Sequence, residues 1–175
     1  TLIGSALAIA LLPTLSEIFA RGERDLFSDT INRAVKALLA LTLPIAALLA
    51  IGLVTLIPLV FGFDAGGSQI VLWTTRAYLL GLAGHALLET AARSFYAQQD
   101  ALTPLYLAAF NALVYIVAAI NLSRLLAAPG IALANTIAFT TEALLLLIIL
   151  RRRYPQVLRM GSSLLRAAAA ALLAG

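Results

Sequence analysis

The chain has 175 residues, of which 62% are hydrophobic and only 11% are charged, and its formal net charge is +4. A globular chain is nearer ~25% charged and ~45–50% apolar, so this composition excludes an ordinary water-soluble domain. The sequence has no cysteine and one histidine, His85, which excludes disulfides, thiolate metal sites and multi-histidine metal sites.

Five long apolar segments follow one another along the chain. Each is close to or above the ~18–20 residues that a helix needs to cross hydrocarbon: Leu2–Ile18, Val35–Phe61, Ile70–Tyr96, Pro104–Leu126 and Ile131–Leu150. They are apolar on all sides instead of alternating in polarity, which favours helices over the strands of a barrel. We therefore predict an all-α polytopic transmembrane helix bundle with five spans, plus a truncated sixth that begins near Ser163.

The breaks between these segments give the bundle a direction. They lie at Arg21–Asp29, Gly62–Ser68, Gln98–Pro104, Ala128–Gly130 and Arg151–Gly161. The first, third and fifth breaks, with the adjoining helix ends, hold all of the 12 basic residues except Arg76 and Arg124. Because cytoplasmic loops carry the excess of Lys and Arg, we predict that these three breaks are cytoplasmic. A basic surface for nucleic acid is not expected, since the basic residues are placed as membrane topology requires.

The two ends of the chain, and the first break, carry further expectations. The start lacks an initiator Met and a signal-peptide pattern, and the end lies within another apolar run, so we expect a fragment of a longer membrane protein. Asp29 and Arg33 in the first break suit i,i+4 pairing on a short amphipathic surface helix. A solvated linker that caps the helices is the favoured interpretation of this break.

Charged side chains within the predicted spans are the candidate functional residues, because a charge in hydrocarbon faces a cavity, a partner or the interface. Glu89 and Arg93 are four residues apart and share one helix face, where they either brace the bundle as an ion pair or line a polar wall that faces substrate. Glu142 lies mid-span, where it either binds a cation, a proton or a head group or is held by hydrogen bonds between helices. Hydrogen-bonded packing roles are expected for His85, Asn111, Asn121 and Asn135.

Three prolines lie within the predicted helices, at Pro13, Pro44 and Pro58. Each removes a backbone hydrogen bond and tends to kink its helix. Kinked helices are common in transporters, although kinks also occur as static packing features. The sequence contains no Gly-rich phosphate loop, no HExxH and no nucleophile elbow, so we predict neither an enzyme nor a cofactor.

Two motifs carry a resemblance to a known family. The run Leu11-Leu12-Pro13-Thr14-Leu15-Ser16 resembles the LLPxLS signature of the MurJ/MviN lipid II flippases, which belong to the MOP exporter superfamily. The run Arg93-Ser94-Phe95-Tyr96-Ala97, followed by Asp100 and Thr103-Pro104, resembles the RxFYAxxDxxTP signature of that family. The family pattern is also followed by Leu43-Pro44, by Pro58-Leu59-Val60-Phe61 and by Gly130-Ile131-Ala132-Leu133-Ala134.

The second motif also has a physical interpretation that does not depend on the family. Pro104 falls in the first turn of the next helix, where its missing N–H leaves no bond unmade. Thr103 is expected to cap that helix, and Asp100 lies in the tight turn before it. Asp100, Pro104 and the neighbouring Tyr96 are therefore expected to set geometry and not to take part in chemistry.

The resemblance implies that residues 1–160 form part of a second transmembrane lobe, about helices 8–12 of 14. Residues 161–175 would then begin an additional C-terminal transmembrane helix. It implies transport of lipid II, the undecaprenyl-pyrophosphate-linked peptidoglycan precursor, from the inner to the outer leaflet of the bacterial cytoplasmic membrane by alternating access. The implied partners are lipid II, membrane lipids and the remaining lobe of the same protein, and no nucleic acid.

The resemblance also says which site residues are absent. The cavity arginines of the family lie mainly in the first lobe and just before this segment, so no residue here takes their place. Members that bind a cation use Asn and Asp in the helix that begins at Pro104. The corresponding positions here are Tyr115 and Ala119, with Asn135 on the next helix, and the helix holds no carboxylate.

Other functions are compatible with such a membrane bundle. A polysaccharide-repeat flippase or a drug or ion exporter of the same superfamily would carry a different substrate. A non-transporting membrane scaffold for cell-wall synthesis would not need the charges of Glu89, Arg93 and Glu142. An intramembrane lipid-processing enzyme would require covalent turnover of its substrate.

Overall fold

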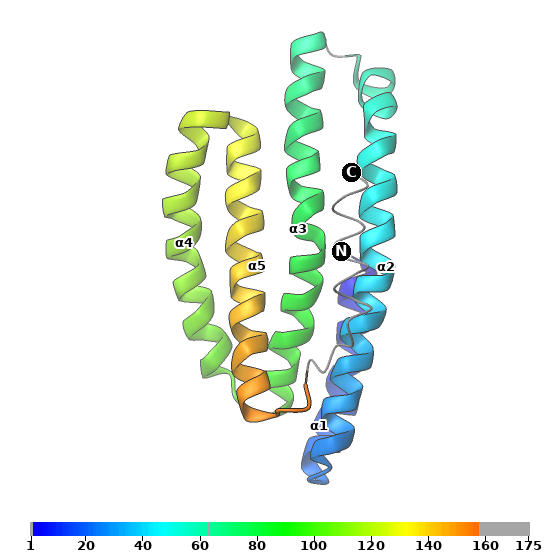
Figure 1. The fold of residues 1–175 in the computed structure, drawn as a ribbon, viewed down its shortest axis with the longest axis vertical. Coiled ribbons are helices and arrows are strands. Elements are labelled where there is room, and N and C mark those ends of the chain that lie inside the picture. Colours follow the sequence, from blue (N-terminus) through cyan, green and yellow to red (C-terminus); the bar gives the residue numbers. More distant parts are fainter. Residues whose placement is uncertain (1, 63, 158–175) are drawn as a thin grey trace.

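The computed structural model describes residues 2–62 and 64–157, and within these ranges the chain forms helices joined by turns, with no strand (Figure 1). The helices are α1 (Leu2–Ala20), α2 (Arg24–Phe61), α3 (Ala65–Ala97), α4 (Leu102–Leu126) and α5 (Ala128–Arg153). The predicted all-α class is confirmed, and each of the five apolar segments lies on one of these helices.

The predicted count of five spans plus a truncated sixth is confirmed only in part. Among the described residues, three helices are long and apolar enough to cross a membrane, namely α2, α4 and α5. Helix α3 carries Arg76, His85, Glu89 and Arg93, which lower its mean hydropathy. In α1 the stretch Leu11–Ala20 is apolar. The predicted sixth helix near Ser163 lies outside the described residues.

Successive helices run in opposite directions, so the turns alternate between the two ends of the bundle. The α1–α2 turn, the α3–α4 turn and the segment after α5 meet at one end, which is the lower end in Figure 1. The α2–α3 and α4–α5 turns lie at the other end. We call the first of these the basic end, defined by residues 21–23, 98–101 and 151–157. The first, third and fifth breaks, which hold most of the basic residues, therefore lie at the same end of the fold.

Helix α2 is longer than predicted and begins inside the charged break. Its 38 residues extend about 57 Å at 1.5 Å per residue, well beyond a hydrocarbon layer of ~30 Å. Residues 21–23 of the break form the turn, and the charged residues from Arg24 onward form the first turns of the same helix as the span, so the break contains no separate surface helix. Arg33 donates to the backbone carbonyl oxygen of Asp29 at 3.4 Å, in place of the carboxylate pairing that the spacing suggested.

The three prolines lie inside helices, and these helices continue through them. Pro13 is within α1, whereas Pro44 and Pro58 are both within α2. Each proline removes one backbone donor without ending its helix, and the kinks expected at these positions remain a prediction.

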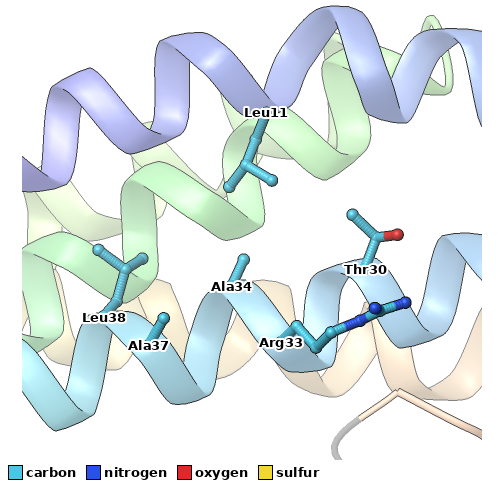
Figure 2. A pocket seen from close by; sticks show the side chains of 6 residues that line it. All are labelled: Leu11, Thr30, Arg33, Ala34, Ala37 and Leu38. Carbon is cyan, nitrogen blue, oxygen red and sulfur yellow. The ribbon is translucent and has the colours of Figure 1, made fainter.

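A groove separates the facing sides of α1 and α2 (Figure 2). It has a volume of about 390 Å³ and is lined by Leu11, Thr30, Arg33, Ala34, Ala37 and Leu38. The lining is mostly aliphatic, with Arg33 as its one charged member. None of the charged candidates within the predicted spans, Glu89, Arg93 and Glu142, lines this groove.

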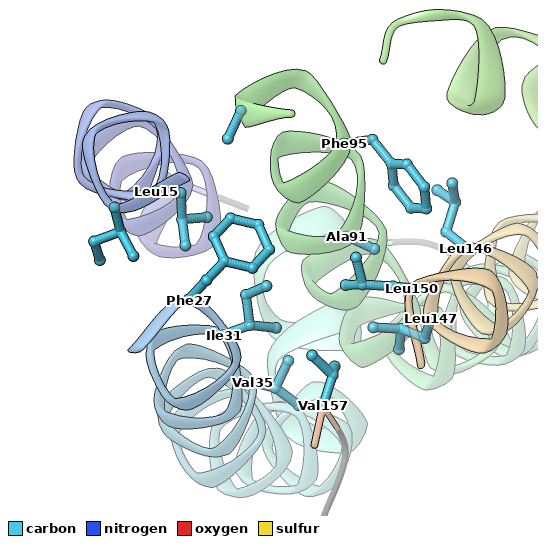
Figure 3. Close-up of a cluster of buried hydrophobic side chains, with 12 residues drawn as sticks. Leu15, Phe27, Ile31, Val35, Ala91, Phe95, Leu146, Leu147, Leu150 and Val157 are labelled. Carbon is cyan, nitrogen blue, oxygen red and sulfur yellow. The ribbon is translucent and has the colours of Figure 1, made fainter. Parts of the chain in front are cut away.

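Helix α3 is at the centre of the bundle and packs against α1, α2 and α5, with a smaller contact to α4 (Figure 1). A buried apolar cluster joins four helices toward the basic end, and Figure 3 shows its side chains converging from α1, α2, α3 and α5. Its fully buried large members include Leu15, Phe27, Ile31, Phe95, Leu146 and Leu150. The outer faces of α2 and α4 instead expose rows of large apolar side chains such as Leu48, Ile51, Leu59, Leu113 and Val117, as lipid-facing surfaces do.

Candidate functional site

The turn between α3 and α4 is built from the residues of the second motif. Asp100 accepts hydrogen bonds from the backbone N–H of Thr103 at 3.0 Å and from the Thr103 hydroxyl at 2.8 Å. Asp100 therefore supplies the capping oxygen at the start of α4, whereas the sequence predicted that Thr103 would do so. Pro104 is buried in the first turn of α4, as expected, and Tyr96 remains half exposed beside the turn.

Arg153 joins this turn to the end of α5. Its guanidinium forms an ion pair with Asp100 at 2.7 Å and lies over the ring of Phe95, 5.2 Å from the ring centroid. A cation at the last turn of a helix also interacts favourably with the negative end of the helix dipole. Sequence reasoning missed Arg153, since it is 53 residues from its partner and is one of three consecutive arginines.

These contacts lower the pKa of Asp100 below its ordinary value. The hydrogen bond from the Thr103 backbone N–H is the largest cause, and the Thr103 hydroxyl and Arg153 act in the same direction. Partial burial of the carboxyl group opposes them. The carboxylate is thus the form that the folded turn stabilises.

Asp100→Asn is expected to destabilise the protein by roughly 0.3–1 kcal/mol at neutral pH, because the amide oxygen can still accept from Thr103 but the negative charge at the start of α4 and the ion pair with Arg153 are lost. The pKa of Asp100 is lower in the folded than in the unfolded state. Its contribution is therefore fully present above the unfolded value of ~3.9 and is lost as the pH falls through the folded value. Thermal unfolding of the full-length protein in detergent, measured from neutral to acidic pH, should show a flatter acid dependence for the variant.

The matched control for this measurement is Asp29→Asn. Asp29 is exposed on α2 and its carbonyl oxygen, not its carboxylate, accepts from Arg33. This variant should keep the acid dependence of the unmodified protein. Equal acid profiles for the unmodified protein and for Asp100→Asn would contradict the assigned role of Asp100.

Glu89 and Arg93 lie on one face of α3 and form an ion pair of 3.1 Å, with 42% and 22% of their side chains exposed, respectively. The Nε atom of Arg93 is buried and has no hydrogen-bond partner among the described residues. The pair therefore leaves one guanidinium donor unused on a partly buried face of the bundle.

The interface between α3 and α5 carries polar contacts and very close backbone approach. His85 Nε2 lies 3.3 Å from Asn135 Oδ1, and the Thr136 hydroxyl donates to the carbonyl oxygen of Ala77 at 2.7 Å. A Cβ atom placed on Gly84 would lie 2.4 Å from the hydroxyl oxygen of Thr140. His85 and Asn135 thus have the predicted hydrogen-bonded packing role. Asn121 does not, because its amide donates to the Val117 carbonyl of its own helix.

Glu142 lies at the α4–α5 interface and is 6% exposed. Its neighbour across the interface is Asn111 of α4, whose side chain interacts with the carboxyl group. No hydrogen bond or ion pair joins Glu142 to the Glu89–Arg93 pair within residues 2–62 and 64–157. No group of three or more His, Asp or Glu side chains able to hold a metal ion occurs in the same ranges.

The comparisons with known proteins agree on one family. A profile described as lipid II flippase MurJ matches residues 1–175. A relative from Rhizobium meliloti (strain 1021), named probable lipid II flippase MurJ, is 33% identical over 146 residues, which are 82% of this chain and 27% of the relative. A relative of the same name from Rhizobium tropici is 30% identical over 139 residues, covering 78% of this chain and 26% of the relative.

The chain therefore spans about a quarter of the length of these curated relatives. The match covers both motifs and the helices that carry them, and the two relatives agree in name. The chain belongs to the family described as lipid II flippase MurJ.

Proposed function

We propose that this chain is part of the second transmembrane lobe of a flippase that carries lipid II from the inner to the outer leaflet of the bacterial cytoplasmic membrane. The observation that carries the proposal is the family match over residues 1–175. In this assignment residues 1–160 belong to about helices 8–12 of 14, and residues 161–175 begin an additional helix. The partners are lipid II, surrounding lipids and the remaining lobe, and the protein acts as a transporter without covalent chemistry.

The fold is suited to movement between inward-open and outward-open states. The α3–α5 interface relies on Gly81 and Gly84 facing the threonines of α5, and small residues at helix interfaces allow close contact without interlocking side chains. The exposed apolar faces of α2 and α4 provide the lipid contact that such a lobe needs. Pro13, Pro44 and Pro58 are proposed as points at which α1 and α2 bend.

Arg93 and Glu89 are proposed to line or brace the transport cavity. The partial exposure of the pair and the preference of a guanidinium for anionic groups support contact with the anionic pyrophosphate head group. The family match disfavours a polysaccharide-repeat or drug exporter. A non-transporting scaffold remains the competing function, and it makes a different prediction for these charges.

The full-length protein is expected to rescue cells depleted of their own lipid II flippase, and Arg93→Gln is expected to reduce lipid II translocation at least tenfold, or about 1.4 kcal/mol. The measurement is the amount of lipid II that becomes accessible in the outer leaflet. Good membrane expression without rescue by the unmodified protein would overturn the proposed function.

A second variant separates head-group contact from bracing. If Arg93 only balances the charge of Glu89, then the double variant Glu89→Gln/Arg93→Gln should recover activity, because no unpaired charge remains. If Arg93 contacts the head group, the double variant stays as inactive as Arg93→Gln, which is the expected result. The control is Arg151→Gln, which removes an exposed arginine at the basic end and should leave translocation unchanged.

A further inference from the structure

Two buried polar side chains face each other between α4 and α5, away from the motif residues. Glu142 is 6% exposed and Asn111 is 8% exposed, and they interact across the interface. Both lie near the middle of helices that are long and apolar enough to cross a membrane. A carboxyl group at this depth needs either a compensating cation or a proton, because an unpaired charge is strongly disfavoured in hydrocarbon.

The neighbouring helices offer no cation for this carboxyl group among the described residues. On α3, Arg93 is paired with Glu89, His85 lies against Asn135, and Arg76 reaches the Ala50 carbonyl. On α5 the basic residues begin only at its last turn. The remaining titratable or charged groups of α3 and α4 are Tyr78, Tyr96, Tyr106, Tyr115 and Arg124, and Glu142 forms no ion pair with any of these within the described ranges.

Asn111 supplies an independent observation that points to a proton. Its Oδ1 atom is buried and has no hydrogen-bond donor among the described residues. A carboxylate only accepts hydrogen bonds, so an ionised Glu142 leaves this amide oxygen unsatisfied. A protonated Glu142 donates its O–H to Oδ1, while the amide N–H₂ donates to the other carboxyl oxygen, and both groups are then satisfied.

A metal cation fits the same place less well. Its side-chain ligands would come from two residues, with up to two oxygens from the Glu142 carboxylate and one from the Asn111 amide. No group of three His, Asp or Glu side chains suitable for a metal ion occurs in the described part of the chain. Hard cations are bound by larger sets of oxygen ligands.

We propose that Glu142 and Asn111 form a proton-binding site at the α4–α5 interface, in which Glu142 is held as a neutral carboxylic acid. The proton is bound while α4 and α5 are packed together. Exposure of the carboxyl group to water would remove its hydrogen bond to Asn111 and would also remove the energetic cost of ionising it. Proton binding and α4–α5 packing are therefore linked, and each favours the other. The link to transport rests on the proposed function, whereas the proton site itself does not.

Infrared spectroscopy of the full-length protein in lipid nanodiscs at neutral pH tests the site without any substrate. The unmodified protein is expected to show a protonated-carboxyl C=O band that is lost in Glu142→Gln and shifted to higher frequency in Asn111→Leu, because the hydrogen bond is gone. Glu89→Gln is the control and should leave the band in place. Since no transport is measured, failure of the flippase assignment would not alter this result.

Two outcomes would overturn the proton site. One is a spectrum in which Glu142→Gln removes no protonated-carboxyl band, which means that Glu142 is ionised. The other is a band that disappears when Na⁺ replaces K⁺ at constant pH, which identifies a cation site. Gln is close to the neutral acid in shape and its amide can donate to Asn111, so this variant should fold. If Glu142→Gln does not fold, ¹³C labelling of glutamate identifies glutamate C=O bands. A protonated band that shifts between the unmodified protein and Asn111→Leu then supports the site, and the absence of such a band overturns it.

Discussion

Replacing Phe95 by alanine is expected to destabilise the bundle by about 3–5 kcal/mol, the range for removing a buried aromatic side chain. Phe95 is 0% exposed and extends from the central helix α3 toward Leu146 of α5 (Figure 3). Its ring also lies beneath the Arg153 guanidinium. The truncation therefore leaves a cavity in the apolar cluster that joins α1, α2, α3 and α5 and also removes the support of the Arg153–Asp100 pair.

The measurement is the free energy of unfolding of the full-length protein in mixed micelles, followed by circular dichroism. Phe110→Ala is the matched control, because Phe110 is 48% exposed on α4 and its truncation leaves an outer surface instead of a closed cavity. It should change the free energy of unfolding by less than about 1 kcal/mol. Equal losses in the two variants would show that the cluster does not hold the helices together.

The sequence predicted the membrane class and the positions of the later helices well. Segments Pro104–Leu126 and Ile131–Leu150 correspond closely to α4 and α5, because hydrophobic length sets their extent and Pro or Gly marks their starts. The same criterion failed for α2. Charged residues such as Arg24 and Asp25 mark the end of an apolar run, but an exposed helix tolerates them, so the helix begins well before the apolar segment.

In the candidate site, contacts within one helix were predictable from the sequence, whereas contacts between helices were not. The Glu89–Arg93 pair was predictable, since residues four apart on a helix are neighbours whatever the fold. Two contacts depend on how separate helices pack against one another, namely Asp100 with Arg153 and Glu142 with Asn111. The periodicity of a single sequence does not predict such packing. The functional roles of the polar residues within the spans stay predictions, and the reason to follow these residues is that each requires a partner in hydrocarbon.

Gly130→Ala is expected to separate the α4–α5 hairpin, with a loss of stability at or above the upper end of the ~1–3 kcal/mol range for overpacking. A Cβ atom on Gly130 would lie 2.1 Å from the carbonyl oxygen and 2.4 Å from the carbonyl carbon of Leu122. The obstructing atoms are backbone, so no change of rotamer relieves the clash. One residue, Ala127, connects the two helices, which leaves the hairpin little freedom to adjust.

Gly52→Ala is the control, since a Cβ at this position in α2 meets only the Leu56 Cδ1 atom, at 4.0 Å. Alanine is favoured over glycine inside a helix by roughly 0.5–1 kcal/mol, so this variant should match or exceed the stability of the unmodified protein. Unfolding in mixed micelles measures both. If Gly130→Ala were as stable as Gly52→Ala, the close approach of α4 and α5 would be contradicted. A loss confined to Gly130→Ala, accompanied by a weaker protonated-carboxyl band, would show that the tight hairpin also keeps Glu142 against Asn111.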